Sequence, residues 1–300
     1  MIRALALVGL MTLVSQQPTA PPTGSAQTPP DTDIYELSFN GQLETLKSAT
    51  PQAISVAKGY DNQPFFTPDG AAVLFTANRD GKQTDIFEFD RGARRVRQLV
   101  ATPEAEYSAT ITPDGKGFSV IRVESGGTQR LWRFDRDGRN PRLVLTDIQP
   151  VGYHAWVDPD RLVLFVLGKP STLQTALVST GKGTVVASNV GRSIQRMPGG
   201  SAISFVERLE NGEYWVKELN PVTGSSTPFV MAPAGSTERD CAWLPDGTLL
   251  MSAATRIVAW RRGEGWRDVY DVAAHKLGTV TRMAVAPDGR SVAIVVNEGK

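Results

Sequence analysis

The chain has 300 residues, of which 41% are hydrophobic and 21% are charged, and its formal net charge is +1. This composition is typical of a globular protein with a sizeable core. The 32 Lys and Arg residues nearly balance the 31 Asp and Glu residues and form no long basic run, which argues against a nucleic-acid-binding protein. We therefore expect no nucleic acid among the partners.

The N-terminus has the pattern of a secretory signal. Met1-Ile2-Arg3 supplies a positive charge, and an apolar run follows from Ala4 to Val14. This run is too short to cross a bilayer as a helix, which needs about 20 residues. We predict a signal peptide over residues 1–16, export to the bacterial periplasm or out of the cell, and no transmembrane segment after signal removal. The single cysteine, Cys241, fits a periplasmic protein but not a disulfide-stapled extracellular domain.

Residues 17–32 are rich in Pro, Thr, Ser, Gly and Gln, so we predict an extended linker there. The next segment, 33–50, is predicted to form two strands, 33–39 and 43–50, on either side of a turn at Asn40-Gly41-Gln42. A similar pair of strands recurs at 85–102 around Gly92. That later pair follows a turn and two further strands, so a complete repeat has four strands, which we name A to D.

A Pro-Asp-Gly turn followed by an apolar strand marks each repeat. Proline presets φ at the first turn position, aspartate hydrogen-bonds the local backbone and glycine accepts a positive φ, so each copy predicts a tight reversal between strands A and B. The steps between the turns are 45, 46, 39, 47 and 42 residues, and a period of this size indicates a repeat architecture. The six turns, two of them degenerate, are marked by Pro68, Pro113, Pro159, Pro198, Pro245 and Pro287.

Counting strands around these turns gives five complete units and one divided unit. The divided unit takes strands A and B from residues 282–300 and strands C and D from residues 33–50. Four-stranded units of this length are typical of propeller blades. We therefore predict an all-β protein, a six-bladed β-propeller over residues 33–300 whose last blade is closed by N-terminal strands. The five complete blades are predicted over residues 60–101, 107–146, 153–187, 193–231 and 239–272.

The repeats resemble those of the TolB-like propeller family over about residues 33–300. The resemblance lies in the Thr-Pro-Asp-Gly turns, in the B-to-C loop Asn78-Arg79-Asp80-Gly81 and in the Asp-Ile-Phe or Asp-Ile-Tyr start of strand C. It implies a six-bladed propeller in an exported bacterial protein. TolB itself carries an α/β domain ahead of its propeller, whereas strand C here begins within 33 residues of Met1, so the resemblance concerns the propeller alone. Related propellers also occur beside serine peptidases and in polysaccharide lyases, so the fold leaves the function open.

One rim of the predicted propeller holds the regular Pro-Asp-Gly turns, and the other holds the irregular D-to-A and B-to-C loops. We expect function on the irregular rim. Residues just before or early in each strand A should converge there on the channel mouth and could bind a polar ligand, a peptide end or a cation. The alternative is a water-filled channel whose charges pair among themselves. The predicted binding residues are Tyr60, Asp61, Asn62, Gln63, Glu106, Tyr107, His154, Arg192, Arg196, Glu238, Arg239, Asp240 and Arg282.

His154 is one of only two histidines in the chain. If its ring faces the channel it is a functional candidate, and if it lies between blades it is a core residue. The segment 135–138 begins like a calcium loop, but it lacks the later acidic ligands, so we interpret it as a hairpin turn. We expect no metal and no other cofactor.

The sequence contains no Gly-x-Ser-x-Gly elbow, His-Glu-x-x-His helix, phosphate loop or dinucleotide fingerprint. We therefore assign no catalytic residue and expect a binding or scaffold module for a protein or glycan partner in the cell envelope, acting through the channel mouth. The alternative is a hydrolase or lyase with a polar active site in the channel, with His154 or a channel carboxylate as the base.

Overall fold

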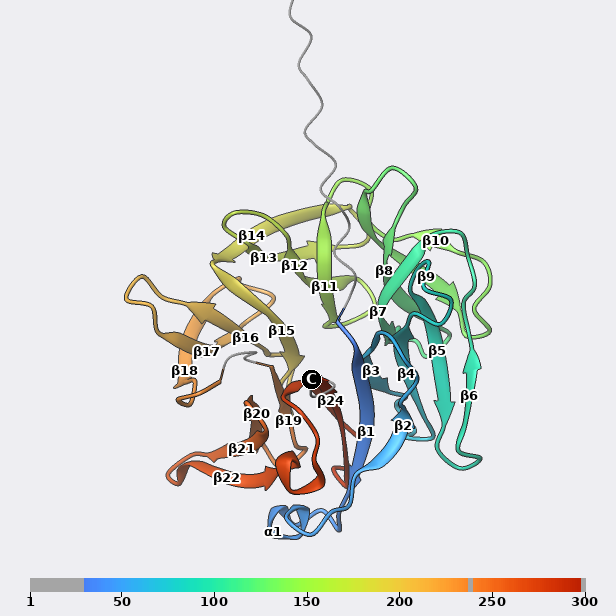
Figure 1. Cartoon of the computed structure of the whole chain (residues 1–300). Helices are drawn as coiled ribbons and strands as arrows, with labels where there is room; N and C mark the ends of the chain where they lie inside the picture. The colour runs from blue at the N-terminus through green and yellow to red at the C-terminus, as the bar shows by residue number, and fades with distance from the viewer. Residues whose placement is uncertain (1–29, 237–239, 298–300) are drawn as a thin grey trace, which may run out of the picture.

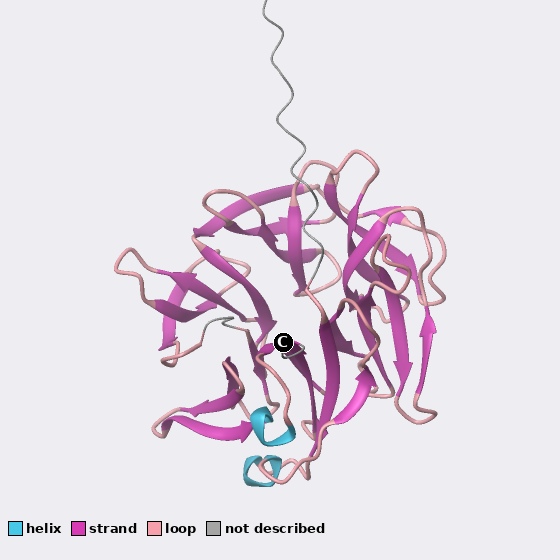
Figure 2. Cartoon of the chain, in the orientation of Figure 1, coloured by secondary structure: helices cyan, strands magenta, loops and turns pink. Residues whose placement is uncertain are grey.

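The computed structural model describes residues 30–236 and 240–297, which form six four-stranded antiparallel sheets around a central axis (Figure 1). Nearly all of the regular structure is strand, with two short helical segments (Figure 2). The predicted six-bladed propeller is confirmed. The predicted signal peptide and residues 17–29 of the predicted linker lie outside the described residues, and β1 begins at Thr32, the last residue of that linker.

Each blade has an inner strand A that lines the axis and a strand B hydrogen-bonded to it. The A strands are β3 (Asp61–Phe66), β7 (Ala105–Ile111), β11 (Val151–Trp156), β15 (Val190–Arg196), β19 (Cys241–Trp243) and β23 (Val280–Val285). The B strands are β4 (Ala72–Ala77), β8 (Gly117–Val123), β12 (Arg161–Val166), β16 (Ile203–Arg208), β20 (Leu249–Ala253) and β24 (Ser291–Asn297).

Strands C and D complete each blade toward the outside. The C strands are β5 (Asp85–Asp90), β9 (Gln129–Asp135), β13 (Thr172–Leu177), β17 (Tyr214–Leu219), β21 (Arg256–Arg261) and β1 (Thr32–Ser38). The D strands are β6 (Arg95–Gln98), β10 (Arg142–Leu143), β14 (Lys182–Ser188), β18 (Ser226–Met231), β22 (Gly265–Asp271) and β2 (Gln52–Ser55). Neighbouring strands are consecutive in sequence in five blades. The exception is the last blade, whose strand order is β2-β1-β24-β23.

The ring is closed by pairing between the two ends of the described chain. Strand β1 pairs antiparallel with β24 from Thr32 opposite Asn297 to Ser38 opposite Ser291. The N-terminal strands therefore supply C and D of the blade whose A and B strands are C-terminal, as predicted. This pairing removes the open edge that either partial blade would present alone.

The predicted strand over residues 43–50 is wrong. Residues Leu43–Leu46 form the short helix α1, and the outer strand β2 begins only at Gln52. Leu43 and Leu46 are both buried, in the cluster that contains Leu37 and Val272. A spacing of three residues puts two side chains on one face of a helix but on opposite faces of a strand, so burial of both favours the helix.

The Pro-Asp-Gly turns have the predicted chemistry. Gly70 and Gly115 adopt φ values of 67° and 68°, which glycine accepts without strain. The Asp69 carboxylate accepts hydrogen bonds from the Thr67 hydroxyl at 2.6 Å and from the backbone N–H of Ala71 at 3.0 Å. The threonine before the proline thus belongs to the turn, because its hydroxyl orients the aspartate.

The hydrophobic core consists of six layers, one between each pair of neighbouring blades. The large residues near the ends of the inner strands contribute to these layers. Phe66 packs with Ala293 and Val295 of the last blade, and Trp243 packs with Val206 of the blade before it. Burial against a neighbour on each side fixes the blade positions, and with them the side chains that face the axis.

Candidate functional site

The inner strands are irregular near the ends where they begin. Pairing to strand B shifts register between Asn62 and Phe65 in β3 and between Tyr107 and Thr110 in β7, and similar shifts occur in β11, β15 and β23. Within two of these bulges, Gln63 and Ser108 adopt φ values of 57° and 55°, which residues other than glycine rarely take. Such conformations cluster at ligand sites, because the surrounding structure must hold them.

A cavity of about 630 Å³ occupies the axis of the propeller and is lined by all six inner strands. Its volume falls within the range of about 300–1,000 Å³ that is usual for small-molecule sites. Three sets of residues define it. The floor is formed by Gln63, Ser108, Tyr153, His154, Asp240 and Arg282; the wall includes Phe65, Ile111, Trp156, Ile194, Trp243 and Val285; the mouth includes Pro68, Pro113, Asp114, Gly115 and Arg196.

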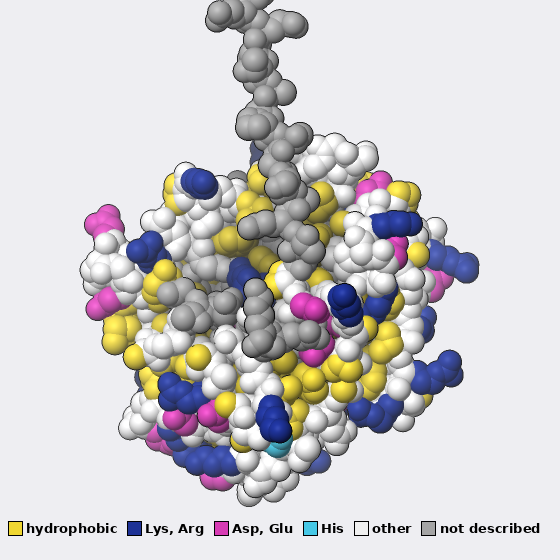
Figure 3. All heavy atoms as spheres, viewed as in Figure 1, with side chains coloured by type: hydrophobic (Ala, Val, Ile, Leu, Met, Phe, Trp, Pro, Cys, Tyr) yellow, Lys and Arg dark blue, Asp and Glu magenta, His cyan; other side chains and the backbone are white. Residues whose placement is uncertain are grey.

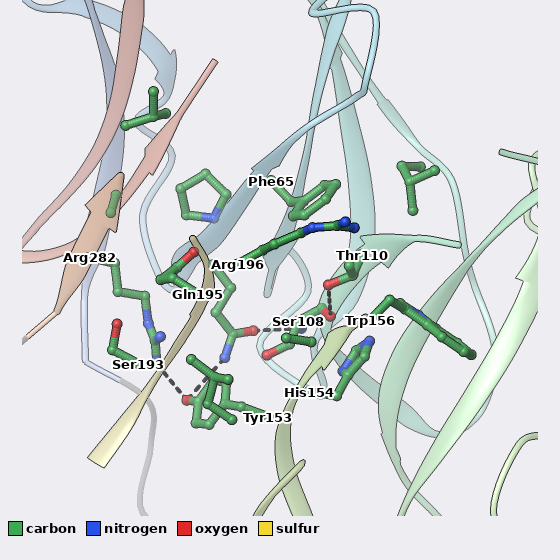
Figure 4. Close-up of a pocket in the computed structure, with 18 of the residues that line it drawn as sticks. Phe65, Ser108, Thr110, Tyr153, His154, Trp156, Ser193, Gln195, Arg196 and Arg282 are labelled. Atoms are coloured by element: carbon green, nitrogen blue, oxygen red, sulfur yellow. Dashed lines mark hydrogen bonds between the residues drawn. The ribbon is translucent and has the colours of Figure 1, made fainter. Parts of the chain in front are cut away.

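Hydrogen bonds across the axis close the floor (Figure 4). The Tyr153 hydroxyl, from the third blade, accepts hydrogen bonds from the Arg282 guanidinium of the last blade and from the Gln63 amide of the first. The Arg282 guanidinium also lies 4.7 Å from the Tyr153 ring centroid. The side-chain oxygen of Gln63 accepts from the backbone N–H of Ser108 at 2.8 Å, which extends the network to the second blade. The cavity therefore ends at this network.

The exposed lining residues lie at the opposite end, beside the Pro-Asp-Gly turns. Pro68, Pro113, Asp114 and Arg196 are exposed, whereas the floor residues Gln63, His154, Asp240 and Arg282 are buried. The cavity thus opens at the rim of regular turns and not at the rim of irregular loops where we expected the mouth. The physical reason is size, since Tyr153, Gln63 and Arg282 are long enough to meet across the axis near the start of the inner strands.

His154 lies on the inter-blade side of β11 yet borders the cavity. Its Nε2 is 2.6 Å from the Ser119 hydroxyl, which also accepts a hydrogen bond from the Trp156 indole N–H at 2.8 Å. Burial lowers the pKa of the imidazole to about 3, so the ring is neutral near pH 7. Its Nδ1 and the Ser108 hydroxyl oxygen are both buried and have no hydrogen-bond partner in the described structure.

Asp240 is the carboxylate of the floor. It is 3% exposed, and burial raises its pKa against the opposing influence of Arg282. One of its oxygens accepts a hydrogen bond from the backbone N–H of Met283 at 2.6 Å, which ties β23 to the residue ahead of β19. The floor therefore combines one buried carboxylate with one buried guanidinium on neighbouring blades.

The structure brings six of the predicted binding residues to the cavity and places five elsewhere. Those that line it are Gln63, His154, Arg192, Arg196, Asp240 and Arg282. Glu238 and Arg239 lie outside the described residues. The side chains that do not line the cavity are those of Tyr60, Asp61, Asn62, Glu106 and Tyr107.

Two of those five form buried ion pairs inside their own blades. Asp61 accepts a hydrogen bond from Arg79 at 3.0 Å, and Glu106 accepts one from the Arg122 Nε at 3.0 Å. Asn62 donates to the Thr32 hydroxyl, which links the first blade to the closing strand. The Tyr60 and Tyr107 rings meet edge to face, 6.4 Å apart. The ion pairs thus lie within single blades, and the contacts of Asn62, Tyr60 and Tyr107 link neighbouring blades.

Sequence reasoning did not foresee the wall of the cavity. Trp156 and Trp243 carry no signal in the sequence that they face the axis. Alternation within strand A could have found another part of the lining, because Thr110 and Ala155, two positions beyond Ser108 and Tyr153, return to the channel side.

Among residues 30–236 and 240–297, no group of three His, Cys, Asp or Glu side chains is placed to hold a metal ion. None of the helices in this part of the chain is long and apolar enough to cross a membrane. Charges of both signs are interspersed on the face shown in Figure 3.

No protein-family model matches this chain. Solved structures do match it. A TolB from Agrobacterium tumefaciens, described as putative, superposes with a TM-score of 0.70 at 16% identity, over 91% of this chain and all of that one. The chain shares the TolB propeller fold.

Other propellers with different activities match over most of their length. An oligogalacturonate lyase in complex with manganese gives a TM-score of 0.59 at 13% identity, covering 92% of this chain and 95% of that one. A chain from a nidogen–laminin complex gives 0.60 at 12% identity, covering 86% and 99%. At identities this low, the superpositions show that the fold is shared and nothing more. The same fold occurs in an enzyme and in a protein complex.

Proposed function

We propose that this protein is an exported binding module for a protein or glycan partner in the cell envelope, and that a projecting end of the partner enters the central cavity past the Pro-Asp-Gly turns. The observation that supports this most strongly is the cavity itself, open at one end and closed at the other by polar side chains from several blades. A concave site with an apolar wall and a few convergent polar groups is the usual form of a binding pocket.

The titratable groups favour binding over catalysis. His154 is a weak base, because burial lowers its pKa to about 3 and its Nε2 already bonds Ser119. Burial raises the pKa of Glu106 to about 7, a value that would suit a general base, but Glu106 pairs with Arg122 away from the cavity. Neither His154 nor Glu106 is therefore a base poised against a ligand in the cavity.

The alternative, a hydrolase or lyase, depends on Asp240. This carboxylate borders the cavity and has a raised pKa, as a general base often has. An Asp240→Asn variant separates the two functions, because it should abolish turnover by an enzyme, whereas a binding module has no step that needs this carboxylate as a base.

Export is supported by the positive start and the apolar run of residues 4–14. Removal of residues 1–16 should leave the protein in the cytoplasm, as cell fractionation would show. Recovery of the truncated protein in the periplasm would contradict export by this segment.

The cavity is tested by filling it. Thr110 borders it on β7, so Thr110→Trp should block entry, and the matched control is Val185→Trp on the outer strand β14, where Val185 is already exposed. In a pull-down from the native cell envelope, we expect the wild type and the control to retain the same partner and Thr110→Trp to lose it by about tenfold or more. Equal retention by both variants, with matching circular dichroism, would contradict the proposed site.

A further inference from the structure

On the basis of the proposed function, we infer that the cavity receives the C-terminal carboxylate of a peptide chain, with the carboxylate on the floor and apolar side chains against the wall. The inference depends on which groups of the floor lack partners, and on what the wall can and cannot offer a ligand.

Arg282 is the main anion-binding group. It is 8% exposed, and its hydrogen bond in the described structure goes to the Tyr153 hydroxyl. A guanidinium has five N–H donors, so most of its donor capacity is unused. Among the described residues, no carboxylate lies within 4 Å of it. A buried charge without a close counter-charge is costly, and a carboxylate matches the fork of a guanidinium with two parallel hydrogen bonds.

Asp240 compensates only part of the positive charge on the floor. It attracts Arg282 without forming a close pair, and one of its oxygens is taken by the Met283 N–H. Arg192 also borders the cavity and contributes a second positive charge near Asp240. The buried guanidinium of Arg282, with no carboxylate of the described residues close to it, therefore favours an anionic ligand at this end.

The Tyr153 hydroxyl is a second donor at the same end of the cavity. Its oxygen accepts two hydrogen bonds, from Arg282 and Gln63, so its own proton can point to a ligand. Figure 4 shows the Arg282 guanidinium beside this hydroxyl. A ligand carboxylate can therefore find a donor beyond Arg282.

The wall favours a peptide over a sugar. It is made largely of aliphatic and aromatic groups, among them Ile111, Ile194 and Val285. The two indole N–H groups of Trp156 and Trp243 are already bonded to Ser119 and Ser204. A sugar acid would have to bury its hydroxyl groups against this surface with few partners, whereas the side chain of an apolar C-terminal residue needs none.

The test compares probes that differ only at the carboxylate. The probes are N-acetyl dipeptides ending in Leu, Ile, Val or Phe, each as the free acid and as the C-terminal amide, with digalacturonate as the sugar acid, all titrated into the full protein by calorimetry. We expect at least one free acid to bind, its amide to bind about tenfold or more weakly, and digalacturonate to bind more weakly than the free acid. Equal binding of acid and amide, no binding by any free acid, or tighter binding of digalacturonate would overturn the inference.

Three variants show where the carboxylate binds. Arg282→Gln should weaken the free acid about tenfold or more and leave the amide unchanged, whereas Arg94→Gln, on the exposed outer surface, should change neither. Tyr153→Phe should weaken the free acid several-fold, because it removes the hydroxyl that stands beside Arg282 on the floor. If Tyr153→Phe and Arg282→Gln both bind the free acid like the wild type, the floor is not the site.

The two proposals fail separately. If Thr110→Trp loses the native partner but acids and amides bind the wild type equally, the cavity is a binding site and the carboxylate inference is wrong. If Thr110→Trp keeps its partner, the proposed function itself is wrong.

Discussion

The inner strands bury charges in two different ways, and the contrast separates structure from function. In the first two blades, Asp61 and Glu106 are inaccessible to solvent and each pairs with an arginine of its own blade. In the last blade, Arg282 is almost as deeply buried, but among the described residues it has a tyrosine hydroxyl as its partner and no close carboxylate.

A paired charge and an unpaired charge have different consequences. Removing one member of a buried pair leaves the other without compensation, so such pairs contribute to stability chiefly through the cost of breaking them. A buried charge with unused donors gains a partner only when a ligand arrives. We therefore expect mutations of the first kind to affect folding and mutations of the second kind to affect binding.

The largest expected effect is from breaking the pair of the second blade. Arg122→Met should lower the free energy of unfolding by about 3 kcal/mol at pH 8, because Glu106 would lose its counter-charge in a buried site. Arg97→Met is the control, since Arg97 pairs with Glu88 on an exposed surface, and it should cost no more than about 1 kcal/mol. Chemical denaturation measures both. If the two variants lose similar amounts of unfolding free energy, the buried pair contributes no more to stability than the exposed one, and the account is contradicted.

Glu106 should also make stability depend on pH. Burial outweighs Arg122 and raises its pKa to about 7, above the usual 4.5, so the folded state holds this proton more tightly than the unfolded state. Its contribution is fully present below pH 4.5 and is lost as the pH rises through 7. The free energy of unfolding of the wild type should therefore fall by on the order of 2 kcal/mol between these pH values relative to that of Glu106→Gln. The measurement is the free energy of unfolding of both proteins as a function of pH. Parallel curves would contradict the raised pKa.

The smallest stability effect is expected at Arg282. Arg282→Gln should change the free energy of unfolding by about 1 kcal/mol or less, since it removes a buried charge that has no close counter-charge and gives up one hydrogen bond. A loss as large as that of Arg122→Met would show that Arg282 supports the fold in the same way as the paired charges do.

Most of the fold could be predicted because it repeats. The residues of each Pro-Asp-Gly turn favour one local conformation. The repeat period and the incomplete last repeat together imply that N-terminal strands close the ring. The segment 43–50 could not be predicted from the repeat, because its helix depends on where Leu43 and Leu46 find neighbours from blade five and the last blade. The strand was predicted by analogy with residues 96–102, and that analogy takes no account of these tertiary contacts.

The lining of the central cavity could be predicted in part, because it too follows from the repeat. Symmetry brings residues such as Gln63 and Arg282 to the axis, and sequence position reveals that much. Which end of the channel is open depends on side chains meeting across it. Tyr153 contacts residues about 90 and 129 positions away, and no local pattern encodes such pairs. The prediction of a mouth among the irregular loops assumed an open channel, and this network closes it.

The central claim, that the cavity binds a chain end on its floor, is tested most directly by a crystal structure of the protein with the tightest-binding N-acetyl dipeptide acid. We predict that the carboxylate oxygens lie about 2.7–2.9 Å from the Arg282 guanidinium nitrogens, with the apolar side chain against the wall. Density for the peptide outside the cavity, or inside it with the carboxylate at the mouth near Arg196, would contradict the account.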